Sequence, residues 1–216
     1  SEWKSEFTYD SYTNQYLYGI IILLFIKKNK WNNTMLLHDI DERILYMNYD
    51  SVPLRDFKEL NDWDTVIFVY KSALKQVRTK IDILNDEFQH RHKYNPIEHI
   101  KYRIKTPESI VKKLKRHGYD SSIENMVRYV NDIAGIRISC SFTSDIYLIA
   151  DMLSKQNDLT ILARRDYMKN PKRSGYRSYH MLVTTPVFLS DSIIDTKVEI
   201  QIRTVAQDFW ATLEHK

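Results

Sequence analysis

Residues 196–204 read TKVEIQIRT, and this stretch decides the class of fold. Its apolar side chains, Val198, Ile200 and Ile202, alternate with polar ones. A period of two is typical of a strand that buries one face and leaves the other polar. Residues 97–104 are interpreted as a short strand or an extended segment before a helix. Three further β-like runs are expected to be strands, at 134–142, 159–167 and 179–188.

Helices alternate with these runs. Apolar residues recur every three or four positions over 63–91, which predicts a long amphipathic helix. The sequence Thr106-Pro107-Glu108 is a strong helix start, with a capping hydroxyl, a proline at the first helical position and a carboxylate at the positive end of the dipole; Gly118 ends this helix. Other helices are expected over about 121–131, over 144–155 and from Val205 onward. The pattern predicts an α/β or α+β domain with a mixed β-sheet flanked by helices.

Composition narrows the class of protein further. The chain has 216 residues, enough for one domain with an appendage, and its 43% hydrophobic content excludes a disordered chain. The single cysteine, Cys140, excludes a disulfide scaffold and a thiolate-rich metal site, and it fits a reducing compartment. The net charge is only +4, but residues 61–216 carry 25 Lys and Arg against 19 Asp and Glu. This local surplus favours an anionic ligand over a nucleic-acid coat.

The N-terminal segment follows no clear pattern. Its apolar run 17–26 (LYGIIILLFI) is half of the roughly 20 residues that a bilayer span needs, and acidic residues precede it, unlike a signal peptide. We therefore expect a buried strand or short helix there, no membrane role and a cytoplasmic protein. The pair His38-Asp39 suggests an HD-type hydrolase, but the segment is too short for that large helical domain. Met47 is either the natural start, with 1–46 as translated upstream sequence, or follows a real N-terminal extension; the main domain is expected over 47–216.

Positive charge gathers in residues 101–116, which carry seven Lys and Arg against one acidic residue. On a helix that begins at Pro107, four residues are expected to share one face: Ser109, Lys112, Lys113 and Arg116. With Arg103 and Lys105 leading into the helix, this face could neutralise a triphosphate. The alternative is a solvated basic helix surface.

Two carboxylates, Asp132 and Glu199, are candidates for a functional role. Asp132 precedes the run 134–142, at the rim of the sheet, and Mg²⁺ is commonly held by one or two carboxylates plus substrate phosphates. Alone, Asp132 would serve equally well as a helix-end or turn residue. Glu199 is the one carboxylate on the polar side of its strand, and the alternative for it is an edge strand that faces water.

Residues 169–180 (KNPKRSGYRSYH) combine basic side chains, a glycine turn, aromatic rings and a histidine. A tyrosine can stack on a purine while Lys and Arg reach phosphates, so this segment is interpreted as a nucleotide-binding loop. A plain exposed loop would explain the basic residues, but it explains Tyr176, Tyr179 and His180 together less well. P-loop, Rossmann and zincin motifs do not occur in the sequence.

The order and spacing of these motifs resemble the RelA/SpoT-type synthetase domain, most closely that of the small alarmone synthetases. The resemblance covers about residues 62–216 and rests on RIK…SI..KLKR (103–116), DIAGIR (132–137), DY.KNPK.SGYRSYH (166–180), VEIQIRT (198–204) and FWATLEHK (209–216). It implies a nucleotidyltransferase-like core and a pyrophosphokinase that moves the β,γ-diphosphate of ATP to the 3′-hydroxyl of GDP or GTP, with Mg²⁺ as cofactor.

The resemblance also implies a role for each motif residue. Arg103 and Arg137 would sandwich the adenine, and the ATP phosphates would be held by Lys105, Ser109, Lys113 and Arg116. Asp132 would bind Mg²⁺, while Glu199 would orient or deprotonate the 3′-hydroxyl and share the metal. Tyr176 would stack on the guanine, assisted by Lys172, His180 and Gln201.

The oligomeric state and two rival functions are left open by the sequence. Family members commonly form tetramers through helices that follow the LEHK motif, where this chain ends, so a homo-oligomer is expected but its state is left open. The first rival function is pyrophosphate transfer to an RNA 3′ end by the same ATP residues, against which the modest charge surplus argues mildly. The second rival is an inactive nucleotide- or RNA-binding module, which the presence of both Asp132 and Glu199 argues against.

Overall fold

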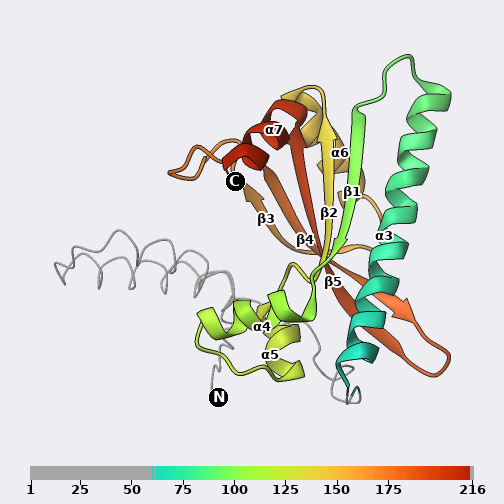
Figure 1. Cartoon of the computed structure of the whole chain (residues 1–216). Coiled ribbons are helices and arrows are strands. Elements are labelled where there is room, and N and C mark those ends of the chain that lie inside the picture. The colour runs from blue at the N-terminus through green and yellow to red at the C-terminus, as the bar shows by residue number, and fades with distance from the viewer. Residues whose placement is uncertain (1–59, 61, 215–216) are drawn as a thin grey trace, which may run out of the picture. The chain divides into compact units, whose positions relative to one another are not determined.

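The structure, a computed structural model, describes residue 60 and residues 62–214 (Figure 1). The apolar run 17–26, the His38-Asp39 pair and the boundary at Met47 lie outside these described residues, as does the expected extension 1–46. Within the described part, no helix has the length and apolar character that crossing a bilayer requires.

A single mixed sheet confirms the expected class of fold. Its strand order is β1-β2-β5-β4-β3. The pair β2–β5 is parallel, and the other neighbouring pairs are antiparallel. The strands are β1 Ile97–Ile104, β2 Ala134–Cys140, β3 Thr160–Asp166, β4 Tyr179–Phe188 and β5 Ile193–Thr204. Because β5 is central, the edge-strand alternative for Glu199 is wrong.

Two of the described helices pack on one face of the sheet, and the others lie at its two ends. α3 (Trp63–Arg91) packs on the face that buries Val198, Ile200 and Ile202, where the Tyr102 hydroxyl donates to Asp82 of α3 over 2.7 Å. α6 (Thr143–Ser154) packs there too, with Tyr147 edge-on to Tyr179 of β4. At opposite ends of the sheet, Figure 1 shows α7 (Val205–Glu214) and the pair α4 (Pro107–Arg116) and α5 (Ile123–Tyr129).

Most predicted boundaries hold within a few residues, and two differ for local reasons. The helix expected over 121–131 is shorter, because Ser122 caps α5 through a hydrogen bond from the Asn125 amide and the backbone becomes extended at Val130. The central strand begins earlier than expected, at Ile193, because β4 continues to pair with it as far as Phe188. The segment 97–104 is a strand, because it pairs with β2 along almost its whole length.

Candidate active site

The face of the sheet turned away from α3 carries polar residues in two rows that cross the strands. The first row pairs Lys101 with Arg137, Arg137 with Gln201, and Gln201 with His180. The second pairs Arg103 with Gly135, Gly135 with Glu199, and Glu199 with Leu182. Strand register thus brings four separate sequence motifs together on one surface.

Asp132 forms the centre of a cationic cluster at the α4–α5 end of this face. Its two carboxylate oxygens accept from Lys105 Nζ at 2.8 Å and from Lys113 Nζ at 3.0 Å. The Arg103 guanidinium lies 3.7 Å from the same carboxylate. Burial raises the pKa of Asp132, but the charges and hydrogen bonds of the two lysines outweigh it and lower the pKa to about 2. Asp132 is therefore ionised throughout the physiological range.

A buried lysine supports the turn that carries Asp132. Lys197 of β5 donates to the backbone oxygen of Arg128 at 3.2 Å and to Asn131 Oδ1 at 2.6 Å. Its side chain is almost fully enclosed, and burial lowers its pKa to about 7. These contacts tie the C-terminal end of α5 and the residue before Asp132 to the central strand.

The basic residues around α4 differ in exposure. Lys105 and Lys113 keep only 15% and 18% of their side chains exposed, so the solvated-surface alternative is wrong for them. Ser109 and Arg116 are exposed on α4, and the Ser109 amide donates to the capping hydroxyl of Thr106. Lys112 is exposed and lines an open hollow with Pro107, Glu108, Val111 and Lys115, whereas the neighbouring Lys113 contacts Asp132. The shared face of Ser109, Lys112, Lys113 and Arg116 stays a prediction.

Glu199 lies between the cationic cluster and the loop that precedes β4. Its Oε1 lies 3.2 Å from His180 Nδ1, and its Oε2 accepts from Gln201 Nε2 at 3.0 Å. Burial and the nearby charge of Asp132 raise the pKa of Glu199, but His180 and Gln201 outweigh them, and the net pKa lies below its usual value. The two carboxylates are thus ionised and close enough to interact.

Tyr176 stands on the other side of Glu199, in a turn closed by Gly175. The positive φ of +83° at Gly175 lies in the left-handed region that glycine adopts without strain. The Tyr176 hydroxyl accepts from Arg203 at 2.7 Å and lies 2.9 Å from His180 Nε2. Lys172 Nζ lies 5.6 Å from the centre of the Tyr176 ring. Tyr176 is therefore half-buried and fixed by its hydroxyl, while its ring stays at the edge of the site.

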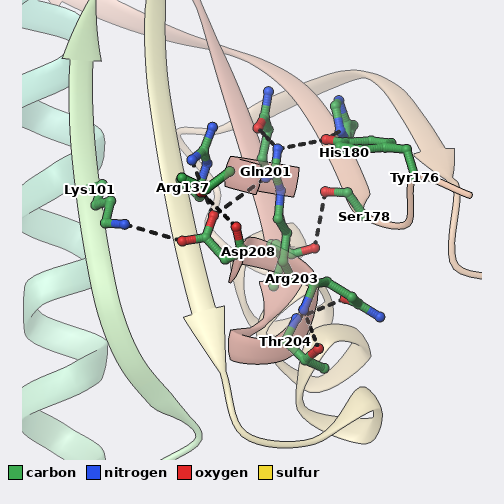
Figure 2. Close-up of polar contacts among 12 residues, drawn as sticks. Lys101, Arg137, Tyr176, Ser178, His180, Gln201, Arg203, Thr204 and Asp208 are labelled. Atoms are coloured by element: carbon green, nitrogen blue, oxygen red, sulfur yellow. Dashed lines mark hydrogen bonds and ion pairs between the residues drawn. The ribbon is translucent and has the colours of Figure 1, made fainter. Parts of the chain in front are cut away.

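Three residues of this face were given no role by sequence reasoning: Lys101, Arg203 and Asp208. All three meet in Figure 2, where the carboxylate of Asp208 on α7 contacts Lys101, Arg137 and Arg203. The alternation of 196–204 already places Arg203 on the polar side of β5. Asp208 lies in a helix whose docking on the sheet no sequence pattern reveals.

The donors present fit a magnesium ion. Asp132 and Glu199 are ionised carboxylates on adjacent segments, and carboxylate oxygens with substrate phosphates are the ligands that Mg²⁺ prefers. The described residues contain no cluster of three or more His, Cys, Asp or Glu side chains suited to a metal. An ion at this site would therefore depend on phosphate oxygens from the substrate for its remaining ligands.

Gly135 forms the floor between Arg103 and Glu199, and it allows a direct test of where ligands bind. A Cβ at this position would lie 3.8 Å from the Arg103 carbonyl oxygen, which is an ordinary contact. Gly135→Val should therefore fold, and its melting temperature should equal or exceed wild type, since β-branched residues favour strands. We expect nucleotide turnover to fall at least ~10-fold because the isopropyl group covers the floor. The turnover of Gly135→Ala should lie between those of wild type and Gly135→Val. If Gly135→Val kept full activity, the ligands would have to bind elsewhere.

The chain is similar to known proteins in sequence. Residues 102–216 match the family described as a region found in RelA / SpoT proteins. The chain is 47% identical over 157 residues to the GTP pyrophosphokinase YwaC of Bacillus subtilis (strain 168), covering 73% of this chain and 75% of that protein.

Solved structures show the same core. The crystal structure of small alarmone synthetase 2 from Bacillus subtilis has a TM-score of 0.64 at 46% identity, over 72% of this chain and 79% of that one. Small alarmone synthetase 1 from Bacillus subtilis, bound to its product pppGpp, has a TM-score of 0.66 at 35% identity, over 71% and 77%. A structure of the same synthetase bound to AMPCPP has a TM-score of 0.60 at 30% identity, over 71% and 76%.

Proposed function

Because the chain belongs to the RelA/SpoT family, we propose that it is a GTP pyrophosphokinase that uses ATP as the donor. The 3′-hydroxyl oxygen of GDP or GTP attacks the β-phosphorus of ATP, and the bond from that phosphorus to the α–β bridging oxygen breaks. AMP leaves with the bridging oxygen, the hydroxyl proton is released, and the products are AMP and (p)ppGpp. The observation that carries this proposal is a pair of ionised carboxylates, Asp132 and Glu199, between a lysine cluster and an aromatic loop.

The lysine cluster fits the donor triphosphate. Lys105, which directly follows β1, and Lys113 of α4 are largely buried and converge on Asp132. In the proposed complex they hold phosphate oxygens, joined by the exposed Ser109 and Arg116 of α4. Arg103 and Arg137 come from paired strands one row apart, and their planar guanidinium groups suit the two faces of an adenine ring.

Mg²⁺ would be held by Asp132, with Glu199 sharing it and the phosphates completing its ligands. When bound, the ion neutralises charge that develops on the transferred diphosphate. Asp132 suits this role because it is ionised over the whole working range of pH.

The aromatic loop fits the acceptor. Tyr176 offers its ring to the guanine, while Lys172, His180 and Gln201 surround it and the adjacent Glu199. Glu199 would accept a hydrogen bond from the attacking 3′-hydroxyl and so fix its direction. Because its pKa lies below the usual value, Glu199 is ionised and can accept this hydrogen bond, and it would either orient the hydroxyl or take its proton. Phosphoryl transfer relies mainly on positioning and charge, which is consistent with this role.

A comparison of three possible acceptors tests the proposal. The protein is incubated with ATP, Mg²⁺ and one of GDP, GTP or a CCA-ended RNA, and AMP release and the modified acceptor are quantified. We expect AMP in equal amount to a 3′-diphosphorylated guanine nucleotide, and none with RNA. Transfer to RNA alone would replace the proposal with the RNA-modifying function, and no AMP with any acceptor would contradict it. A homo-oligomeric state stays a prediction that light scattering can check on the same sample.

Substitution of Tyr176 tests the acceptor site separately from the donor site. Tyr176→Ala removes the stacking face, and since stacking contributes ~1–3 kcal/mol per base, GDP affinity should fall by about 5- to 150-fold. Affinity for an ATP analogue should stay close to wild type. Tyr176→Phe keeps the ring but loses the hydroxyl contacts with Arg203 and His180, so its effect should be smaller. Separate titrations with GDP and with an ATP analogue measure the two affinities, and melting curves measure stability. Equal losses of affinity for both ligands would show that Tyr176 only stabilises the conformation of the loop.

A further inference from the structure

We propose that Asp208 is a positioning residue that holds Arg137 and Arg203 on the polar face and so links the two nucleotide subsites. This inference rests on the proposed function, because it takes Arg137 as a donor-side residue and Tyr176 as an acceptor-side one. No sequence motif suggested it. It follows from the way α7 places one carboxylate beside three cations from three strands (Figure 2).

The first observation is the charge arrangement around Asp208. Its Oδ1 lies 3.1 Å from Arg137 Nη1 and 3.4 Å from Arg203 Nη1, and its Oδ2 lies 3.2 Å from Lys101 Nζ. The Asp208 side chain is 11% exposed and that of Arg203 is 4% exposed. A buried guanidinium is costly without a counter-charge, so Asp208 is what allows Arg203 to stay in this place.

The second observation is that Arg203 reaches the acceptor side. Its Nη2 donates to the Tyr176 hydroxyl at 2.7 Å and to Gln201 Oε1 at 2.6 Å, and its guanidinium carbon lies 5.0 Å from the centre of the Tyr176 ring. Arg203 thus joins Asp208 at one end to Tyr176 and Gln201 at the other. Displacing Arg203 would release the ring that is proposed to stack on guanine.

The third observation concerns the donor side. Arg137 is held by Asp208 through Nη1, and its Nε is buried with no hydrogen-bond partner among the described residues. Its side chain is 35% exposed. An arginine fixed at one edge keeps its planar face available for stacking, at little further cost in side-chain entropy. Loss of Asp208 should therefore weaken the ATP site as well as the acceptor site.

The test is Asp208→Asn, which keeps the size of the side chain and removes its charge. Affinities for AMPCPP and for GDP are measured by calorimetry, kcat and KM by AMP release, and stability by thermal melting. We expect both affinities to fall about 5- to 20-fold, with KM rising more than kcat falls. The matched control is Asp145→Asn, another buried aspartate, which accepts from the Phe142 amide at 3.0 Å and from the Tyr94 hydroxyl, on the α6 side of the fold. It should lower the melting temperature and leave both affinities within twofold of wild type.

Double substitutions distinguish positioning from general destabilisation. If Asp208 acts on ATP through Arg137, then Asp208→Asn should weaken AMPCPP no further in an Arg137→Gln background, while its effect on GDP should persist. Affinities within twofold of wild type in Asp208→Asn, or an undiminished AMPCPP loss in the Arg137→Gln background, would overturn the inference. If Asp208→Asn does not fold, Asp208→Glu, which shifts the charge by one methylene, is held to the same criteria. Wild-type protein that binds neither ligand would instead count against the proposed function.

Discussion

Glu199→Gln should lower turnover at least ~100-fold while leaving AMPCPP affinity nearly intact. The carboxylate that would accept from the 3′-hydroxyl becomes an amide, whose nitrogen cannot accept a hydrogen bond. The side-chain oxygen of Gln at position 199 can still accept from the Gln201 amide, and its new NH2 group then takes the place of Oε1, 3.2 Å from His180 Nδ1. The proposal assigns ATP binding to Lys105 and Lys113, both of which contact Asp132.

A strand glutamate outside the site provides the control for this substitution. Glu98 of β1 is exposed and accepts from the Ser141 hydroxyl, so Glu98→Gln should retain wild-type turnover. Single-turnover rates with saturating ATP and GDP separate the chemical step from product release. A Glu199→Gln variant that turns over at the wild-type rate would remove Glu199 from the mechanism.

Asp132→Asn should abolish the response of the enzyme to Mg²⁺ and reduce turnover at least ~100-fold at every Mg²⁺ concentration. An amide oxygen is a weaker ligand than a carboxylate for a hard cation, which explains the loss. The same change removes the negative charge of Asp132 that Lys105 and Lys113 contact. We therefore expect AMPCPP to bind at least as tightly as to wild type when Mg²⁺ is absent, a result that general unfolding would not produce.

Titration of activity and of AMPCPP binding against Mg²⁺ measures both effects. Asp120→Asn is a suitable control, because Asp120 is an exposed aspartate that accepts from the Ser122 amide in the turn between α4 and α5. It should keep the wild-type Mg²⁺ dependence. Activity of Asp132→Asn with an unchanged Mg²⁺ dependence would mean that the metal lies elsewhere.

The alternation of apolar and polar residues along a strand predicted both the sheet and much of the polar face that carries the candidate site. Alternation along 196–204 assigns Val198 and Ile200 to the core and Glu199 to the opposite face, and strand register then aligns Glu199 with Gly135 and Arg103. Asp132 lies three residues before Gly135 in the same motif, so its position follows once the register is known. Local patterns therefore sufficed wherever a side chain's direction was set by its own strand.

The parts that escaped prediction depend on contacts between elements distant in sequence. Asp208 lies on a helix whose docking over β2 and β5 is a tertiary event, and Lys101 reaches it from a strand more than a hundred residues earlier. The sequence also does not show which lysine of α4 faces Asp132, and in the structure this is Lys113. The roles of the individual site residues stay predictions that the variants above address.

The most direct test of the central claim is the mass of the modified acceptor together with the fate of the donor. Wild-type protein is supplied with ATP labelled in both its β- and γ-phosphates, Mg²⁺ and GDP, and the products are separated and analysed by mass spectrometry and phosphorus NMR. Transfer of an intact diphosphate predicts unlabelled AMP and a guanine nucleotide that carries two labelled phosphates on its 3′-oxygen. A product with a single labelled phosphate and ADP as the other product, or labelled inorganic phosphate with no modified acceptor, would contradict it.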